Sequence, residues 1–420
     1  MDIAEIKMLE KEYGLPLYIF DEEEFKKNYL NLLNTFRAIY PKYNIAYSYK
    51  TNYTPRICKL VKELGGLAEV VSEMEYQLAK KIGYKNEDII FNGPVKGNAL
   101  SEHLLSNGTI NIDSLDELSR VIDLSKENRD KTLHIVFRVN IDIGQSFISR
   151  FGLDAYEDNS KKSELDTAFE LISDYPNIVV DGLHCHVGRS RNIDAWKNRV
   201  RVMFSLVDRY FDKPPKFIDF GSGMNSVMEE SLAAQFGNSI PTFQEYANVL
   251  AIAMNKKYGH LAEEDKPYLY TEPGTTVVSG FMSFIGKVES IKNVKGKTYI
   301  TFNCSYGNLS ELATQKRLPI TVFHNSDENE KYENATFVGY TCLEHDHIYE
   351  GYNGEMSVGD YVEFRNVGSY SNVFKPPFIL PNCAMVSKDS QNKYKIIKEA
   401  ENFEYIFKIY FLRSDRSGRV

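Results

Sequence analysis

The stretch IAYSYKTNYTPRICKLVKELGGLAEVV, residues 45–71, decides the fold of this chain. It opens with an apolar run at 45–49, continues through an amphipathic stretch over Pro55–Glu63, and closes with a second apolar run at 67–71. Short runs rich in Ile, Val and Tyr are typical of buried strands, and the stretch between them has helical spacing. The segment therefore predicts two parallel strands joined by a helix.

The same pattern recurs over the first 280 residues. Eight apolar runs alternate with polar, helix-patterned sequence, at 45–49, 67–71, 88–91, 109–112, 133–139, 178–186, 217–220 and 268–271. Strands that alternate with helices form parallel sheets covered on both faces. Eight such units predict a TIM-type (β/α)8 barrel, which we expect to occupy residues 25–280.

After Gly280 the sequence changes to short segments rich in Val, Ile, Tyr, Phe and Thr, separated by Gly, Asn and Asp. That composition is typical of an all-β domain, here residues 281–420. Residues 15–20 are also strand-like, and we expect the N-terminal segment 1–24 to pair into this β domain. The predicted fold class is therefore α/β: a barrel plus a C-terminal all-β domain completed by the N-terminal segment.

The composition argues against several classes of protein. The formal net charge is −8 without a basic cluster, which argues against a nucleic-acid partner. Five cysteines, widely spaced, indicate neither a disulfide scaffold nor a CxxC metal site, and a reducing cytoplasm suits them. The N-terminal residues lack a signal-peptide core, and no apolar stretch reaches the ~20 residues that span a bilayer. We expect a soluble, cytoplasmic protein without a membrane partner.

Polar side chains stand where the predicted strands end. Functional groups of a (β/α)8 barrel collect at the carboxyl ends of its strands, so we expect these side chains to converge. They are Lys50, Glu69 with Ser72, Asn92, Asp113, Arg138 with Asn140, His184 with His186, Gly221 to Gly223, and Glu272 with Gly274. Their convergence predicts a functional site at the mouth of the barrel.

Each of these residues also has a structural interpretation. Lys50 is either a Schiff-base amine, since desolvation lowers the pKa of a buried lysine, or a lysine that reaches from a strand end to solvent. The Gly221-Ser222-Gly223 turn can bring backbone N–H groups to a phosphate, but most such triplets are simple turns. Glu272 can hold a pyridine nitrogen in its protonated form or can cap a helix.

His184 and His186 stand at alternate positions of a strand, so both side chains point the same way. A zinc site needs third and fourth ligands that the spacing does not offer, so we expect no metal and favour stacking of one imidazole on a flat cofactor ring. Cys342 lies in the ionisable segment TCLEHDH. Proton transfer by this thiol is therefore an alternative to a buried, unreactive one.

Ten short motifs, in order along nearly the whole chain, resemble the family of ornithine and diaminopimelate decarboxylases, whose fold also includes alanine racemase. They are YSYKTN, AEVVSEMEY, IIFNGPVKG, INIDSLDEL, FRVNID with SRFGLD, DGLHCHVG, DFGSG, TEPG, TCLEHD and VGSYS. Each motif is weak alone, but their shared order is specific. The resemblance implies a decarboxylase of amino acids that depends on pyridoxal phosphate and works as a homodimer with shared active sites.

The resemblance also implies a role for each matched residue. Lys50 would hold the cofactor as a Schiff base, His186 would stack on its ring, and Glu272 would pair with the ring nitrogen. Tyr370 would reach the cofactor as well. Cys342 of the partner subunit would protonate the carbon that loses carbon dioxide. The phosphate would be bound by backbone amides of Gly221, Ser222, Gly223 and Gly274.

Two positions near the cofactor depart from the family pattern. Thr275 stands where the family has an arginine after Glu-Pro-Gly, and we hypothesise that Arg189 supplies the missing positive charge near the phosphate. Unchanged cofactor affinity in Arg189→Ala would contradict this hypothesis. Glu69 replaces the family's usual aspartate, which is a milder change.

Other departures concern the substrate. Leu343 replaces the acid that binds the substrate's distal amino group. Because an unpaired buried ammonium is costly, either Glu344 and Asp346 take over that role or the substrate has no distal amine. Arg317 lies about where the family places an arginine for a distal carboxylate. Diaminopimelate is the default substrate, and another amino-acid derivative is the alternative.

Two other functions stay open at this point. A racemase on the same scaffold would usually use a tyrosine as its second base, where this chain offers Cys342. A catalytically silent binding or regulatory protein would be expected to have lost Lys50, Glu272 or Cys342, and all three are present.

Overall fold

The computed structural model describes residues 1–144, 148–157, 161–237 and 239–410. Contacts between residues divide the chain into two compact units. The barrel unit consists of Phe25–Val227 and Gly237–Val278. The β unit consists of Met1–Glu24, Met228–Phe236 and Ser279–Val420. The β unit therefore gathers three separate stretches of the chain.

Eight parallel strands of the described residues close into a barrel in the barrel unit. They pair in the order β2, β3, β4, β5, β6, β8, β9, β10, and β10 pairs back with β2. A short strand, β7 (Leu153–Asp154), adds to the end of β6. The bounds are β2 Tyr43–Ser48, β3 Leu67–Val70, β4 Ile89–Phe91, β5 Thr109–Ile112, β6 Leu133–Asn140, β8 Ile178–His184, β9 Phe217–Asp219 and β10 Tyr268–Thr271.

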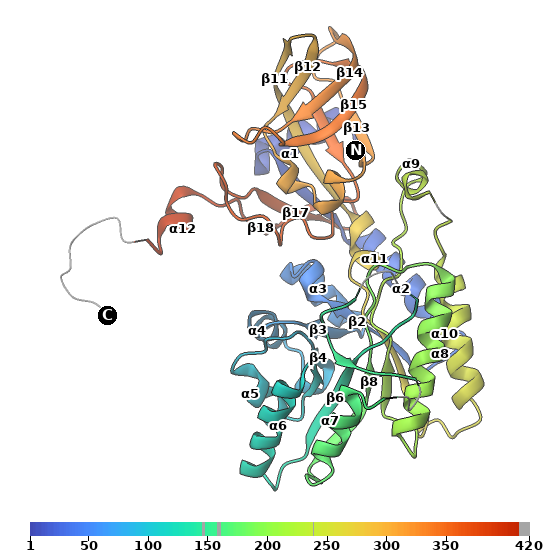
Figure 1. The fold of residues 1–420 in the computed structure, drawn as a ribbon. Helices are drawn as coiled ribbons and strands as arrows, with labels where there is room; N and C mark the ends of the chain where they lie inside the picture. The colour runs from blue at the N-terminus through green and yellow to red at the C-terminus, as the bar shows by residue number, and fades with distance from the viewer. Residues whose placement is uncertain (145–147, 158–160, 238, 411–420) are drawn as a thin grey trace, which may run out of the picture. The chain divides into compact units, whose positions relative to one another are not determined.

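Helices lie around the outside of these strands (Figure 1). They are α2 Glu22–Arg37, α3 Pro55–Glu63, α4 Glu73–Ile82, α5 Ala99–Leu105, α6 Leu115–Glu127, α7 Glu164–Ile172, α8 Ile193–Tyr210 and α10 Phe243–Tyr258, and the short α11 (Thr275–Val278) follows β10. Strands β4 and β5 are buried along their whole length. Burial on both faces is expected where helices cover one face and a packed barrel interior the other. The predicted (β/α)8 barrel is confirmed.

Serine caps start helices directly after strands of the barrel. Ser72 follows β3, and its side chain accepts a hydrogen bond from the Glu75 N–H in the first turn of α4. Ser114 follows β5 and accepts from the Glu117 N–H of α6 in the same way. Each cap satisfies one of the free N–H groups at a helix start. The connections at the carboxyl ends of these strands are therefore short and well defined.

The β unit contains a sheet of nine strands among the described residues. Seven pair in the order β15, β14, β12, β11, β1, β17, β18, and β16 pairs with both β11 and β13. Strand β1 is antiparallel to β11 and parallel to β17, so the N-terminal segment completes the sheet as predicted. The bounds are β1 Leu17–Asp21, β11 Met282–Val294, β12 Lys297–Phe302, β13 Ile320–Phe323, β14 Glu330–Val338, β15 His347–Met356, β16 Tyr361–Phe364, β17 Ala384–Lys388 and β18 Tyr394–Lys398.

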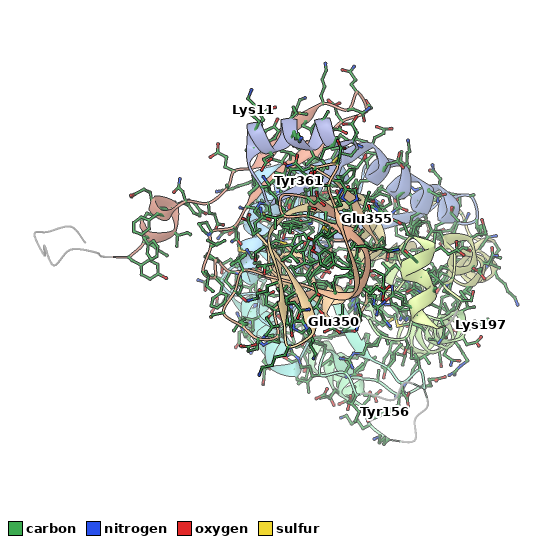
Figure 2. The ribbon with its side chains drawn as sticks, turned by 90° about the horizontal axis from the view of Figure 1, so that it is seen from above. Lys11, Tyr156, Lys197, Glu350, Glu355 and Tyr361 are labelled. Atoms are coloured by element: carbon green, nitrogen blue, oxygen red, sulfur yellow. The ribbon has the colours of Figure 1, made fainter. Side chains whose placement is uncertain are left out.

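Helix α1 (Ile3–Tyr13) covers a core of this sheet, and the sequence does not predict it. Ile6 and Leu9 are buried in a cluster that includes Tyr361 of β16, while Lys11 is exposed at the periphery (Figure 2). Asp2 caps the helix by accepting a hydrogen bond from the Glu5 N–H. The helix therefore depends on burial against strands that are distant in sequence.

The stretch Met228–Phe236 belongs to the β unit although it interrupts the barrel sequence. It contains α9 (Glu230–Ala233). Glu229 forms an ion pair with Arg365, and the Lys316 ammonium donates to the Gln235 carbonyl oxygen at 2.8 Å. A further short helix, α12 (Phe403–Phe407), follows β18. None of the helices in the described ranges has the length and apolar character needed to cross a membrane.

Candidate active site

A cavity of about 420 Å³ opens at the carboxyl ends of the barrel strands. This volume lies within the range of small-molecule binding sites. The cavity brings together the predicted residues Lys50, Glu69, His186, Arg189 and Glu272. The other lining residues are Val71, Asn92, Gly93, Pro94, Arg138, Ser149, Arg150, Phe151, His184 and Gly188.

Lys50 lies in a 3-10 turn, Tyr49–Thr51, rather than at the last position of β2. Tyr49 and Thr51 are buried, so the turn leaves Lys50 as its one residue directed to the cavity. The Lys50 Nζ donates to Glu69 Oε2 at 2.6 Å, and the lysine side chain is 33% exposed while that of Glu69 is 0% exposed. The amine is thus held at the cavity wall by a buried carboxylate.

The Glu69 carboxylate has three donors. Ser48 Oγ donates to the same oxygen as Lys50 at 2.5 Å, and Asn92 Nδ2 donates to the other oxygen at 2.9 Å. Asn92 also donates to Glu272 Oε1 at 2.6 Å and accepts from Asn111 Nδ2 at 2.5 Å. Asn92 therefore bridges the two carboxylates, and a buried charge supported by several donors is fixed in position.

Glu272 follows β10 and is 2% exposed. His184 Nε2 donates to Glu272 Oε2 at 3.0 Å, and His186 Nδ1 lies 3.9 Å from the same oxygen. Burial by itself would raise the pKa of Glu272, but the hydrogen bond from His184 and the charge of Lys50 hold that pKa below its ordinary value. Glu272 is therefore an anion inside the barrel.

The two histidines occupy different environments. The side chain of His184 is 1% exposed and that of His186 is 27% exposed. Burial, followed by the charge of Lys50, lowers the pKa of His186 well below its usual range. A neutral imidazole that is partly open to the cavity is suited to lie against a flat ring.

Asp219 at the end of β9 stands beside this pair and was not among the predicted site residues. Ligand atoms of His184, Asp219 and Glu272 lie within 4.8 Å of one another, so the spacing argument that no third ligand exists is wrong. Burial and the neighbouring Glu272 raise the pKa of Asp219 well above its usual range. His184 and Asn92 already donate hydrogen bonds to Glu272, and the Gly221 N–H donates to Asp219 Oδ1, so these ligand atoms are engaged within the protein.

The predicted glycine turn, residues 220–224, packs tightly against the end of β8. Gly221 has φ +59° and Gly223 has φ +107°, and a Cβ at either position would overlap the carbonyl oxygen of Cys185 or Val187. Only glycine therefore fits these two positions. A Cβ on Gly274 would overlap the Thr51 hydroxyl, which brings the start of α11 against the turn that carries Lys50.

Two of the four amides predicted to bind phosphate already have protein partners. The Gly221 N–H donates to Asp219 Oδ1 at 2.8 Å, and the Ser222 N–H donates to His186 Nδ1 at 3.3 Å. These bonds fix the turn and the imidazole relative to each other. Among the described residues, the amides of Gly223 and Gly274 are the two of the predicted set without such a partner.

Arg199 of α8 binds the backbone of the glycine turn. The sequence analysis did not identify this residue. Its Nη1 donates to the carbonyl oxygens of Phe220 at 3.0 Å and Ser222 at 2.8 Å, and its Nη2 donates to that of Val187 at 2.8 Å. The guanidinium also lies 3.9 Å from the Trp196 ring centroid. Burial lowers the pKa of Arg199 to about 10, so the group keeps its positive charge near neutral pH.

We expect Arg199→Met to lower the free energy of unfolding by about 2–5 kcal/mol, because three buried carbonyl groups lose their donor. The same variant should weaken cofactor binding, since the glycine turn loses its support. The matched control is Arg201→Met on the same helix, where an exposed ion pair with Glu157 is lost and the expected change is below about 1 kcal/mol. Urea unfolding measures both variants. Equal losses of stability would contradict this role for Arg199.

Arg189 and Arg138 carry positive charge at the cavity wall. Arg189 is exposed, and Arg138 is held by Asp113 Oδ1 at 3.3 Å. The Arg138 guanidinium also lies 4.7 Å from the Phe151 ring centroid. The hypothesis that Arg189 supplies positive charge for the phosphate stays a prediction. Arg199 provides a second positive charge, which is buried against the carbonyl groups of the glycine turn.

The β unit carries the remaining predicted residues. Cys342 is exposed, as is Glu344. Asp346 is 2% exposed, and its carboxylate accepts hydrogen bonds from Tyr306 N at 2.9 Å and Thr341 Oγ1 at 2.6 Å. A carboxylate satisfied in this way holds its own loop together. The geometry therefore favours a structural role for Asp346 and leaves Glu344 as the exposed acid of this segment.

Arg317 and Tyr370 also belong to the β unit. The Arg317 side chain is exposed, and its backbone N–H donates to Gln235 Oε1 at 2.9 Å. Tyr370 has φ +53°, a conformation that non-glycine residues seldom adopt, and its ring stacks on Phe374 with centroids 5.5 Å apart. Such strain is retained mostly at functional positions.

The signals for the two missed residues are present in the sequence. Asp219 is the last residue before Phe-Gly-Ser-Gly, at a strand end like the residues that were predicted. Arg199 is three residues after Trp196 and four before Met203, on the apolar face of its helix. A charged residue on a buried helix face needs a partner, and that mismatch is the signal.

Comparison with known proteins places these residues in context. The family model described as pyridoxal-dependent decarboxylase, pyridoxal binding domain, matches residues 27–279. Diaminopimelate decarboxylases of Aquifex aeolicus and Archaeoglobus fulgidus are 25% and 24% identical to this chain, and the alignments cover 96% and 94% of it and 93% and 92% of the relatives.

Two crystal structures share the fold. Diaminopimelate decarboxylase from M. jannaschii aligns with a TM-score of 0.82 at 23% identity and covers 97% of this chain and 94% of its own. Lysine decarboxylase from Selenomonas ruminantium aligns with a TM-score of 0.73 at 18% identity and covers 94% of this chain and 97% of its own. At these identities the likeness supports a common architecture.

Proposed function

The chain belongs to the family of pyridoxal-dependent decarboxylases, and on that premise we propose that it releases carbon dioxide from a diaminopimelate-like amino acid or a related derivative. The observation that carries this proposal is the convergence of Lys50, Glu69 and Glu272 on one cavity at the barrel mouth. The Lys50 amine can form a Schiff base with an aldehyde cofactor, and a buried carboxylate on the same cavity can pair with a pyridine nitrogen.

The residues fit pyridoxal phosphate on three independent grounds. Lys50 is the lysine that lines the cavity. Glu272 is an anion, which a protonated ring nitrogen needs as its partner. Gly223 and Gly274 keep the backbone open where a side chain would collide, so we propose their amides as phosphate donors, with Gly221 and Ser222 shaping the turn.

When bound, pyridoxal phosphate supplies an electron sink for the charge left on the α-carbon when carbon dioxide departs. Residues of the chain would orient the cofactor and stabilise its charged groups. Lys50 would attach the cofactor, Glu69 holds the Lys50 amine in position at 2.6 Å, and Glu272 would pair with the ring nitrogen and favour its protonated form. His186 would lie against the ring face, and the Ser222 N–H keeps its imidazole in place.

We also propose that the β unit completes the active site of a second copy, with Cys342 delivering the proton to the α-carbon. The exposure of Cys342 and the strained Tyr370 support this assignment. Cys342→Ala should slow turnover by about 10²–10⁴-fold, the range for loss of a proton-transfer group. Cys58→Ala, at a fully buried thiol, serves as the control.

Mixing of inactive variants tests the homodimer. Lys50→Ala and Cys342→Ala subunits, unfolded together and refolded, should recover roughly a quarter of the wild-type activity, the statistical share of intact sites in two-fold symmetric dimers. No recovery, with dimers present, would contradict a shared site. Because the five cysteines are free thiols, we further propose a reducing, cytoplasmic setting.

Carbon dioxide release across diamino acids, their D-isomers and their conjugates tests the activity and selects the substrate. Release from at least one of them is expected. Glu344 and Arg317 are the exposed groups that we propose for the distal end of the substrate. Interconversion of D- and L-isomers without carbon dioxide would instead indicate a racemase, and cofactor binding without either reaction would indicate a silent protein.

A further inference from the structure

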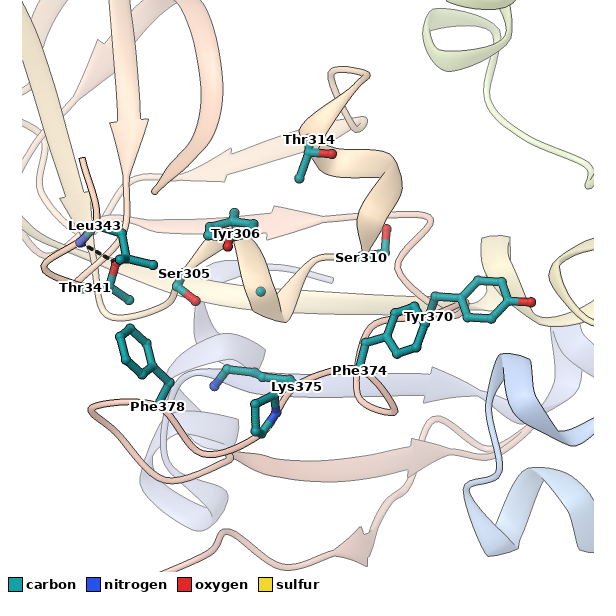
Figure 3. Close-up of a pocket in the computed structure, with 12 residues that line it drawn as sticks. Ser305, Tyr306, Ser310, Thr314, Thr341, Leu343, Tyr370, Phe374, Lys375 and Phe378 are labelled. Carbon is teal, nitrogen blue, oxygen red and sulfur yellow. Dashed lines mark hydrogen bonds between the residues drawn. The ribbon is translucent and has the colours of Figure 1, made fainter. Parts of the chain in front are cut away.

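The barrel cavity and a cavity within the β unit are similar in size but differ in their walls. The cavity in the β unit, of about 450 Å³, has mostly apolar walls that include Phe374 and Tyr370 (Figure 3). The barrel cavity, of about 420 Å³, is lined by several charged residues. Further charged groups lie behind those residues in the barrel unit, and the proposed chemistry does not use them.

A fully buried ion pair is the centre of this second layer. Lys96 Nζ lies 2.7 and 2.8 Å from the two carboxylate oxygens of Glu117. The side chain of Lys96 is 0% exposed and that of Glu117 is 5% exposed. Among the described residues, neither of the two lines the barrel cavity. Any effect of the pair on the cavity therefore passes through other residues.

Stability alone does not explain a buried ion pair. Burial removes water from both charges, and this cost can cancel the attraction between them, so that apolar residues of similar volume often stabilise a protein as well. An ion pair adds a fixed geometry, because each hydrogen-bonding atom must meet its partner. The atoms that Lys96 and Glu117 contact beyond each other therefore indicate what the pair holds in place.

The start of helix α4 shows that Glu117 does not need a lysine to support its own helix. Glu75 and Glu117 are each the third residue of a helix. Glu75 Oε2 accepts a hydrogen bond from the Val71 N–H at 2.8 Å, and Glu117 Oε2 accepts one from the Asp113 N–H at 2.9 Å. Glu75 makes this contact without an ion pair in the described ranges, and burial raises its pKa to about 7. Lys96 therefore has another task at the start of α6.

The Lys96 ammonium reaches the wall of the cavity with its third N–H group. It donates to the Gly93 carbonyl oxygen at 2.6 Å, and Gly93 lines the cavity. An ammonium has three N–H groups, so this bond and the two to Glu117 use all of them. Gly93 has φ +86°, and a Cβ at this position would overlap the carbonyl oxygen of Val71, which also lines the cavity. Lys96 thus fixes the loop after β4 against the wall.

Glu117 extends the same restraint to Arg138. Its contact with the Asp113 N–H fixes the residue that follows β5. The Asp113 carboxylate accepts a hydrogen bond from Arg138 Nη1 at 3.3 Å. Arg138 lines the cavity, and its guanidinium lies 4.7 Å from the ring centroid of Phe151, which lines it too. One buried cluster therefore restrains two parts of the cavity wall.

We propose that Lys96, Glu117 and Asp113 are positioning residues, which hold the Gly93 carbonyl group and the Arg138 guanidinium so that the cavity wall keeps the form that binds pyridoxal phosphate. The inference rests on the proposed function, because it assigns this cavity to that cofactor. The cluster contains two cations and two carboxylates, so their formal charges cancel. A buried network in which these groups have partners makes the surrounding structure rigid.

The test is a titration of the full-length protein, freed of its cofactor, with pyridoxal phosphate. Lys96→Met/Glu117→Gln removes both charges together and keeps an acceptor for the Asp113 N–H. We expect about 10- to 100-fold weaker binding, the range for a lost hydrogen bond to a charged group, because the Gly93 carbonyl group loses its donor. Absorption measures the affinity, and circular dichroism of the bound cofactor should change with it. The urea midpoint without cofactor should stay that of wild type, since no buried charge is left unpaired.

Arg120→Met is the matched control. Arg120 Nη2 donates to the Gly97 carbonyl oxygen at 3.4 Å, so it links the same helix to the same loop, but its side chain is exposed. This variant should keep the wild-type affinity and dichroism. Wild-type affinity in Lys96→Met/Glu117→Gln, with or without a lower urea midpoint, would make the ion pair purely structural and overturn the proposal. Equal losses of affinity in the two variants would overturn it as well.

Asp113→Ala is a second variant, which leaves the buried pair intact. Its backbone N–H still reaches Glu117, so we expect it to fold and to bind pyridoxal phosphate severalfold more weakly. Because Asp113 acts through Arg138, the same change should have no further effect in Arg138→Met. An equal loss in both backgrounds would contradict the positioning role. A wild-type protein that binds no pyridoxal phosphate would instead refute the proposed function and this inference together, and neither measurement requires turnover.

Discussion

Replacing Lys50 with alanine should yield a protein that lacks the visible absorption of the bound cofactor and releases carbon dioxide about 10²–10⁴-fold more slowly. The reason is geometric. The turn Tyr49–Thr51 buries the residues on either side and presents the Lys50 amine to the cavity, 2.6 Å from Glu69. Removing the amine removes the attachment point and the base together. Absorption spectra and carbon dioxide release measure the two losses separately.

Lys59→Ala is the control for this prediction, since Lys59 is an exposed lysine of α3 on the same segment. It should keep both the colour and the activity. If Lys50→Ala retained the absorption band while Lys59→Ala or another lysine variant lost it, the cofactor would be attached elsewhere.

The second large effect is expected for Glu272→Gln, which should lower kcat about 10²–10³-fold, as expected for loss of one preorganised electrostatic contact. Glutamine keeps the shape of Glu272 but carries no charge to hold a proton on the ring nitrogen. Asp219→Asn should cost far less, because burial and the neighbouring Glu272 raise the pKa of Asp219 and so disfavour its charged form. Single-turnover kinetics of the two variants measure the difference.

These two variants form a matched pair: they are neighbouring buried acids, and each is changed to its amide. Equal losses of kcat would mean that the charge is shared between them or lies on Asp219. Restoration of kcat in Glu272→Asp, which keeps the charge, would support the assignment further.

The barrel could be predicted from the sequence because its signals are local. The run at 67–71 and strand β3 differ by one residue, and Pro55–Glu63 is both the predicted and the observed helix. Parallel strands that are buried on both faces are apolar along their length. Each of them can therefore be recognised in the sequence as a short apolar run. The carboxyl ends of such strands meet at one rim, and this is why Lys50, Glu69 and Glu272 could be expected together.

The bounds of elements in the β unit depend on distant parts of the chain. Strand β15 has the sequence HIYEGYNGEM, with two glycines and two glutamates, and its hydrogen bonds come from β14 alone at the end of the sheet order. Propensity does not predict such a strand, because its partner decides it. Helix α1 likewise depends on distant residues, because its apolar side chains are buried against strands β1 and β16.

The site shows the same division. The positions of the strand ends predict which residues line the cavity. They do not predict which of those residues still have a free hydrogen-bonding group. Asp346 stands in an ionisable segment and yet is saturated by Tyr306 and Thr341. The position of Arg199 on the apolar face of α8 indicates a buried partner, but the sequence does not show that the partners are carbonyl groups of two loops.

The most direct test of this account is to trap the cofactor on the protein. Borohydride reduction of the holoprotein, followed by proteolysis and mass analysis, should place the reduced cofactor on the peptide that contains Lys50. Recovery of the label on another lysine, or a reduced protein that carries no cofactor at all, would contradict it.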